Sequence, residues 1–409
     1  EDVDLIFDAP WLHMGQMIGE GYYAELDDLL AKYGKNLQKA RPQLMWEANR
    51  FNNKIMGIPL GNEQLQVGRC FITRKDVREK LGIPPIKSWD EFVKFLYAVE
   101  KNTNLIPFQS FFNGRVTTGM IKAYSEFKLS PTVAMSDSFM LYHKSNDGKV
   151  YNLFDTKEPD LWNGIVQANK LYKDGIIDPD NMAKGNAYDD ILNGKLAATF
   201  NLMAYIQPVW QDQLKAAAPD GELEVHHTWK PEAKVVNAFV MSNFICVPSV
   251  SKKKVEAVKF LDWVHAKQEN YDLLAYGIQG KHWKPVGTSQ YEPIGSDYPW
   301  FPFAWIWNPT MDRFPSIMPP YILKLYKAAA DANSYTKDIL TGFSWDAKAV
   351  ANELAEANTY YSEYYIPISI GTVDNLDASW QKYRNAAYDV MKRIQIELQR
   401  QIDAFLKRK

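Results

Sequence analysis

Cysteine is scarce in this chain: only Cys70 and Cys246 occur among 409 residues. They lie far apart in the sequence and next to apolar residues, a pattern that favours two small buried core residues over one long-range disulfide. A chain of this length can bury large hydrophobic cores without covalent cross-links. Because single cores stop growing at about 250–300 residues, we expect two lobes.

Blocks of charge and long apolar runs are also missing. The 47 Lys and Arg residues nearly balance the 49 Asp and Glu residues, and no block of like charge is longer than Lys252 to Lys254. Nucleic acid is therefore not an expected partner. No run approaches the roughly 18 apolar residues of a membrane span, and the first residues, EDVDLIFDAPW, do not resemble a signal peptide. Any targeting segment is expected to have been removed or to lie upstream of residue 1.

Motifs of catalysis and cofactor binding are absent from the sequence. The six histidines form no HExxH and no metal-ligand spacing, and the adjacent His226 and His227 are expected on opposite faces of an exposed strand. There is no GxGxxG, P-loop or GxSxG motif, so no cofactor, metal site or serine nucleophile is expected. A glycosidase needs two carboxylates across the scissile bond, and none of the acidic residues forms a recognisable pair. A carbohydrate-active hydrolase or lyase remains an alternative function.

Aromatic residues, in contrast, are abundant: 13 Trp, 23 Tyr and 20 Phe. Several lie in polar or Pro- and Gly-containing stretches, where rings serve as stacking surfaces. The least regular stretch is residues 287–320, and within it residues 300–307 hold five large rings: Trp300, Phe301, Phe303, Trp305 and Trp307. Loops this long are usually functional. We predict that Trp305 and Trp307 line a ligand cleft; the alternative is a hydrophobic plug between lobe and loop.

Strand and helix signals alternate along the chain. Ser88-Trp-Asp-Glu91 is a capping box before a helix with an apolar stripe, and Pro159 and Gly175 bracket a second helix. Residues 383–405 form an amphipathic helix that we interpret as structural. Short apolar runs at residues 3–7, 58–60 and 196–200 predict strands, and this interleaving indicates an α/β architecture.

Polar and aromatic residues follow several of these strands. Open α/β sheets bind ligands at such strand ends, so we predict a binding site there. The candidate ligand-binding residues are Asp8, Trp11, Asn62, Glu63, Gln109, Phe112, Asn201 and Tyr205, together with Trp305 and Trp307. The alternatives are a core position for Trp11 and solvent-exposed turns for Asn62 and Glu63. No residue is a catalytic candidate.

The order of these segments is similar to that of the family 1 extracellular solute-binding proteins of bacterial ABC importers, in particular the long lipoprotein branch of Gram-positive bacteria. The resemblance rests on VDLIFDAPW at 3–11, Tyr23 to Asp27, Gly57 to Leu60, Ile83 to Phe92, Asn193 to Ala198, Val247 to Trp263, YGIQGKHW at 276–283 and Gln401 to Phe405. Single matches are weak, but together they span residues 3–409.

The resemblance implies a two-lobed, periplasmic-binding-protein-like α/β fold with hinge-connected lobes. We expect residues 1–109 and 243–290 in the first lobe and 110–242 and 291–409 in the second. Members of the family carry a further strand-helix unit before the DLIF-like strand, and here that unit is missing. The expected function is capture of a sugar or oligosaccharide by lobe closure, without catalysis; a peptide or another solute is a further alternative.

The resemblance also implies where the protein works and with what. It would be an extracytoplasmic monomer, held at the membrane by an N-terminal lipid that this chain does not contain. Its partners would be the ligand and the membrane permease subunits of an ABC importer.

Overall fold

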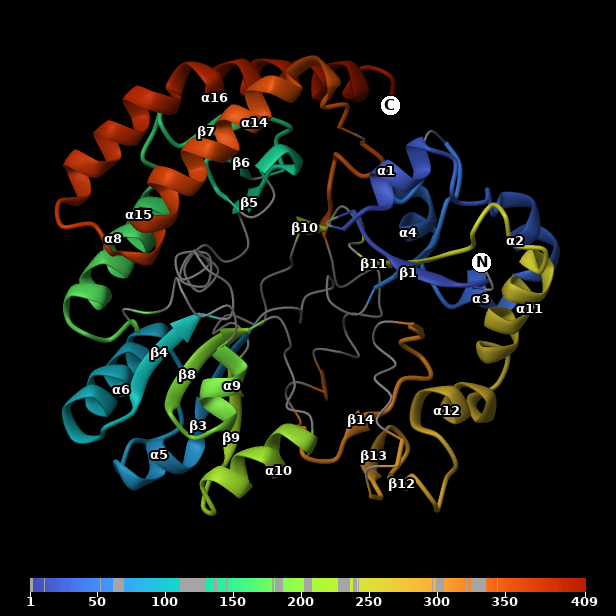
Figure 1. Cartoon of the computed structure of the whole chain (residues 1–409), viewed down its shortest axis with the longest axis horizontal. Helices are drawn as coiled ribbons and strands as arrows, with labels where there is room; N and C mark the ends of the chain where they lie inside the picture. Colours follow the sequence, from blue (N-terminus) through green and yellow to red (C-terminus); the bar gives the residue numbers. More distant parts are fainter. Residues whose placement is uncertain are drawn as a thin grey trace. The chain divides into compact units, whose positions relative to one another are not determined.

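The computed structural model describes the chain outside residues 1–2, 11, 52, 62–69, 111–128, 136–137, 145, 179, 181–186, 202–207, 227–235, 238–240, 242, 296, 299–304, 319, 321–322, 325–335 and 344. The chain forms two compact units (Figure 1). Unit 1 contains residues 1–68 and 237–344, and unit 2 contains residues 69–236 and 345–409. Each unit is thus built from separate stretches of sequence. No described helix is long and apolar enough to cross a membrane.

Unit 1 contains a three-stranded antiparallel sheet with β11 (Asn243–Cys246) in the centre, between β1 (Ile6–Asp8) and β2 (Ile58–Leu60). Ile245 pairs with both Phe7 and Ile58, and every residue of β2 and β11 is buried, as expected for short apolar strands. Helices of this unit that the structure describes include α1 (Met14–Gly19), α2 (Asp27–Tyr33), α3 (Lys35–Lys39), α4 (Gln43–Ala48), α11 (Lys254–Val264) and α12 (Gln268–Tyr276).

A second sheet of unit 1 has the order β12 (Trp283–Val286), β13 (Gln290–Pro293) and β14 (Phe314–Pro315). β15 (Thr336–Lys337) pairs with β10 (Val236–Asn237), whose two residues fall on either side of the boundary between the units. Residues 291–315 therefore fold with unit 1.

Unit 2 is built around a four-stranded sheet with the order β4-β8-β3-β9. The strands are β3 (Cys70–Arg74), β4 (Ile106–Ser110), β8 (Leu196–Asn201) and β9 (Leu223–His226). Helices α5 (Lys75–Lys80), α6 (Trp89–Asn102), α8 (Pro159–Lys173), α9 (Ala187–Leu192) and α10 (Pro208–Ala217) belong to the same unit. Phe71, Phe92, Phe95 and Phe108 are at the centre of its buried core. A separate sheet contains β5 (Leu129–Pro131), β6 (Leu141–Lys144) and β7 (Tyr151–Asn152).

The lobe boundaries expected from the sequence differ from these units. We expected residues up to 109 in the first lobe, whereas β3 and β4 lie in the sheet of unit 2. We expected residues 291–344 in the second lobe, whereas they belong to unit 1. The reason is pairing between distant strands: Ile72 of β3 pairs with Thr199 of β8.

Local helix signals agree with the structure. Ser88 Oγ accepts a hydrogen bond from the Glu91 amide at 3.2 Å, and the Glu91 carboxylate accepts one from the Lys87 amide at 2.7 Å. The predicted N-cap at Ser88 is therefore confirmed at the start of α6, and the reciprocal bond of the capping box goes to the preceding amide, that of Lys87. The helix predicted after Pro159 is α8, and it is followed by Gly175 with a φ of +75°.

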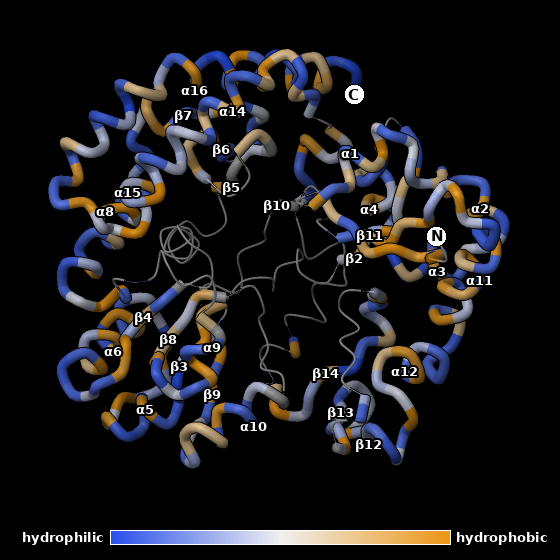
Figure 2. The backbone as a smooth tube through the Cα atoms, viewed as in Figure 1, coloured by the Kyte–Doolittle hydropathy of each residue, from blue (hydrophilic) through white to orange (hydrophobic). Residues whose placement is uncertain are grey.

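The C-terminal part of unit 2 is helical. α14 (Ala351–Tyr360) continues through a π-helical turn (Tyr361–Tyr365) into α15 (Ile366–Ile370). Pro367 has no amide hydrogen to donate to residue 363, and the wider turn just before it accommodates this missing bond. α16 (Leu376–Leu406) follows, longer than predicted, and its buried residues include Tyr383, Ile394 and Leu398. Figure 2 shows hydrophobic and hydrophilic positions interspersed along α16, in keeping with an amphipathic helix.

Candidate functional site

Three strands of the unit 2 sheet end at the same edge, which we call the carboxyl edge. β4 is parallel to β8, and β3 is antiparallel to both β8 and β9, so β4, β8 and β9 all point the same way. Gln109, Asn201 and His226 are therefore at or next to the ends of strands along this edge. Sequence analysis predicted Gln109 and Asn201 as ligand-binding residues, and the sheet brings them to one edge.

The Gln109 side chain is wholly buried next to Thr199 of β8, with which it is in register. Among the described residues, neither its amide nitrogen nor its amide oxygen has a hydrogen-bond partner. An unsatisfied buried polar group costs about 1–3 kcal/mol. A carboxamide can donate two hydrogen bonds and accept others, so this position can bind a ligand that carries hydroxyl groups.

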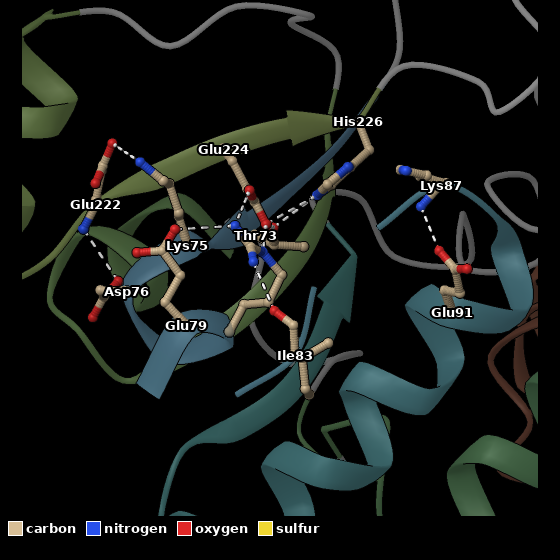
Figure 3. Close-up of polar contacts among 11 residues, drawn as sticks. Thr73, Lys75, Asp76, Glu79, Ile83, Lys87, Glu91, Glu222, Glu224 and His226 are labelled. Carbon is tan, nitrogen blue, oxygen red and sulfur yellow. Dashed lines mark hydrogen bonds and ion pairs between the residues drawn. The ribbon is translucent and has the colours of Figure 1, made fainter. Parts of the chain in front are cut away.

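His226 lies at the end of β9 in a buried polar network (Figure 3). Its Nε2 is 2.9 Å from Thr73 Oγ1 and 3.5 Å from Glu224 Oε1. Arg78 donates from Nε to Glu224 Oε1 at 2.6 Å and from Nη2 to Oε2 at 3.0 Å. Burial raises the pKa of Glu224, but hydrogen bonds from His226 and Arg78 outweigh this effect and lower it to about 2. The network joins β9 to β3 and α5 directly behind the carboxyl edge.

Sequence analysis missed His226, because we expected both His226 and His227 to be exposed. His226 is instead buried, with 9% of its surface accessible; His227 is outside the described residues. The alternation Leu223-Glu-Val-His predicts one polar face of the strand. It does not distinguish a solvated face from one buried against an arginine that lies far away in the sequence.

In unit 1, the two predicted tryptophans have different environments. Trp307 is only 4% exposed, and a β-carbon at Gly61 would lie 2.9 Å from its Cη2 atom, so its indole ring packs directly on the backbone. Trp305 is partly buried and packs against the core cluster that contains Tyr276 and Trp283. Trp305 is therefore only partly shielded from solvent, whereas Trp307 fills the core.

Asp8 supports the loop that follows β1. Its carboxylate accepts hydrogen bonds from the Ala9 amide at 2.7 Å, the His13 amide at 3.3 Å and the Tyr23 hydroxyl at 2.5 Å. Burial and the hydrogen bond to Asp8 raise the pKa of Tyr23. Both Asp8 oxygens thus have partners within unit 1.

For most of the other predicted ligand-binding residues, the structure gives no side-chain position. Trp11, Asn62, Glu63, Phe112 and Tyr205 are outside the described residues, and for Asn201 the structure describes only the backbone. Cys70 and Cys246 are both buried, as predicted for core residues. No group of three or more His, Cys, Asp or Glu side chains suited to a metal ion occurs in the part of the chain that is described.

Comparison with known proteins adds sequence and fold relationships. A relative from Niallia circulans, described as an uncharacterized protein in the butB 5' region, is 33% identical over 136 residues, which cover 32% of this chain and 52% of that protein. This match thus spans about half of that relative. A carbohydrate ABC transporter substrate-binding protein of Streptococcus pneumoniae is 22% identical over 437 aligned residues, covering 100% of this chain and 80% of that protein.

A similar solved structure is the N-glycan transport solute binding protein of Streptococcus pneumoniae, with a TM-score of 0.71 and 17% identity over 100% of this chain and 87% of that one. At this identity the likeness establishes the two-lobed α/β fold. A family model described as a domain of unknown function matches residues 339–407. The family model for bacterial extracellular solute-binding proteins matches residues 2–280, more than half of the chain. The chain therefore belongs to the bacterial extracellular solute-binding protein family.

Proposed function

We propose that this protein is the solute-binding component of an ABC importer and that it captures a sugar or oligosaccharide without changing it chemically. Membership of the solute-binding family supports the transport role. The carbohydrate transporter relative and the N-glycan transport structure support the class of ligand. Permease subunits as partners, a monomeric state, an N-terminal lipid anchor and lobe closure on the ligand belong to the same proposal.

The observation that carries the proposal is the buried, unsatisfied amide of Gln109 at the carboxyl edge. A sugar presents a belt of hydroxyl groups that can donate to and accept from a carboxamide. It also presents apolar C–H faces, on which aromatic rings stack. Binding sites for small molecules combine such a few placed polar groups with aromatic surface.

A screen of oligosaccharides by thermal shift tests the function. At a free ligand concentration of 100 times the Kd, binding stabilises a protein by about 2.7 kcal/mol, so the right sugar should raise the Tm clearly. We expect the sugar to be recovered intact by chromatography. New reducing ends would instead indicate a hydrolase or lyase, and a shift with peptides alone would indicate a different solute.

Replacing Gln109 with leucine should change stability and affinity in opposite directions. The substitution removes an unsatisfied buried polar group, so the ligand-free protein should gain about 1–3 kcal/mol in its free energy of unfolding. Sugar affinity should fall by roughly tenfold, which corresponds to about 1.4 kcal/mol. Urea denaturation and isothermal titration calorimetry measure the two effects.

Asn169 provides a matched control. It is also a buried amide of unit 2, but its Nδ2 donates to the Gly371 oxygen at 2.9 Å and to the Val373 oxygen at 2.8 Å. Asn169→Leu should therefore lower stability and leave sugar affinity unchanged. Loss of stability in Gln109→Leu with unchanged affinity would refute a ligand contact at Gln109.

A further inference from the structure

Helix α12 makes an unusual set of side-chain contacts with the backbone of residues 305–313, which we call the aromatic segment. The Tyr271 hydroxyl accepts a hydrogen bond from the Asn308 amide at 3.1 Å and donates one to the Asp312 carboxylate. The Tyr276 hydroxyl accepts from the Arg313 amide at 2.7 Å and donates to the Arg313 carbonyl at 3.0 Å. Two tyrosines of one helix thus hold the backbone at two points of the segment.

An ion pair between Arg313 and Asp272 adds to the contacts of α12 with the aromatic segment. Arg313 donates from Nε to Asp272 Oδ1 at 3.0 Å and from Nη2 to Oδ2 at 2.9 Å, and both side chains are largely buried. The Arg313 guanidinium also lies 5.0 Å from the centre of the Trp283 ring. Gln268 Nε2 donates to the Met311 carbonyl at 2.8 Å. Two-pronged Arg–carboxylate pairs are among the strongest and most directional polar contacts in proteins.

These α12 residues share one helix face. Gln268, Tyr271, Asp272 and Tyr276 follow the spacing of neighbours on a helix surface. The first residues of the aromatic segment, 305–308, belong to no helix or strand, so regular backbone pairing does not determine their path. Their position depends on this face of α12 and on the packing of Trp307 against Gly61.

We propose that this face of α12 is a clamp that positions the partly exposed ring of Trp305 for stacking on a ligand, with Asp272, Tyr271 and Tyr276 as positioning residues. The effect on ligand binding rests on the proposed function, whereas the positioning of the segment does not. The clamp acts without touching the ligand, because its side chains end on the backbone and side chains of residues 308–313.

Hydrogen exchange in the ligand-free protein tests the positioning directly. In Arg313→Met, the amide of residue 308 should exchange at least tenfold faster than in the wild type, whereas amides of α6 in unit 2 should not change. Tyr276→Phe, which removes one hydroxyl, should give a smaller change in the same direction and serves if Arg313→Met does not fold. Unchanged exchange at residue 308 in both variants would overturn the proposal.

Arg74→Met is the matched control. Arg74 also makes a two-pronged pair, with Asp76 at 2.7 and 2.6 Å, but it lies in unit 2 at the end of β3 remote from the carboxyl edge. This variant should leave exchange at residue 308 unchanged. Faster exchange there in Arg74→Met would show general loosening of the protein and would overturn the specific role of α12.

Sugar affinities of Arg313→Met, Trp305→Ala and the double variant form a cycle that tests the consequence for binding. If the clamp acts through the Trp305 ring, each single variant binds about tenfold more weakly and the double variant binds no more weakly than Trp305→Ala. If the losses of binding free energy in the two single variants add up in the double variant, or if Arg313→Met keeps full sugar affinity, the clamp does not act through the Trp305 ring. If the wild type binds no sugar in the screen, the proposed function has failed, and the exchange rates alone decide whether the clamp positions the segment.

Discussion

Gly371→Ala is expected to destabilise unit 2 by about 4 kcal/mol or more, at the extreme of single substitutions. Gly371 ends α15 with a φ of +93°, a left-handed conformation that costs an alanine roughly 1–2 kcal/mol. The larger cost is steric, because a β-carbon there would lie 2.3 Å from the Ala168 carbonyl oxygen and 2.5 Å from its carbonyl carbon. These are backbone atoms of α8, so only a shift of one helix against the other relieves the clash.

Gly175→Ala is the matched control for this prediction. Gly175 lies in the same unit with a φ of +75°, but no atom lies within 4 Å of the position of an added β-carbon. It should therefore lose only the conformational cost, about 1–2 kcal/mol. Urea denaturation of both variants measures the difference, and similar losses would contradict the close approach of α15 to α8.

The turn at Gly371 also explains how the C-terminal region joins the unit. The Gly371 and Thr372 amides donate to the Pro367 carbonyl at 3.1 and 3.0 Å, and Asn169 of α8 binds the Gly371 and Val373 carbonyls. Residues 339–407, which match a domain of unknown function, include α15 and α16. α15 packs against α8 of unit 2. We infer that the part of this region from residue 345 onwards has a structural role within unit 2.

Features encoded by short stretches of sequence could be predicted. The capping box at Ser88 and the Pro159 and Gly175 signals depend on neighbouring residues, and both helices occur where expected. Asn201 was predicted as a ligand-binding residue because it follows the apolar run at residues 196–200, and Gln109 was predicted as a second one. Their common edge, however, depends on β4 pairing in parallel with β8, a contact between distant segments.

Features that depend on distant partners were not predicted. Trp305 and Trp307 were both predicted to line a ligand cleft. Residue 305 lies in a turn and is partly buried, whereas Trp307 is almost wholly buried against Gly61. The burial of His226 and the unit boundary near residue 69 likewise depend on the pairing of β3 with β9. Periodicity within one segment does not contain this information.

Arg78→Met is expected to cost about 3–5 kcal/mol in the free energy of unfolding at pH 7, the range for breaking a buried ion pair by removing one partner. Only 4% of the Arg78 side chain and 17% of the Glu224 side chain are exposed. Methionine keeps much of the volume but leaves the carboxylate with hydrogen bonds from Thr73 and His226 alone among the described residues. Arg393→Met is the control, because the Arg393 and Glu353 side chains are 51% and 26% exposed and such a pair contributes at most about 1 kcal/mol.

The free energy of unfolding of Arg78→Met should also depend on pH in a different way from that of the wild type. The pKa of Glu224 in the folded protein is about 2, below the value of 4.5 for an unperturbed glutamate. The lowered pKa therefore stabilises the folded state fully above about pH 4.5, and this contribution of about 3 kcal/mol is lost as the pH falls towards 2. Once Glu224 is protonated, Arg78 of the wild type loses its charged partner on β9 and keeps the longer contact with Glu79 at 3.4 Å.

The difference in unfolding free energy between the wild type and Arg78→Met should therefore shrink as the pH falls. Urea denaturation at pH 7, 4 and 2.5 measures it, with the largest difference at pH 7 and the smallest at pH 2.5. A difference independent of pH would mean that Arg78 stabilises unit 2 by packing and by its hydrogen bond to the Ile83 carbonyl at 2.8 Å. A difference that shrinks instead assigns the stabilisation to its charge, and hence to the network that holds β9 in place behind the carboxyl edge.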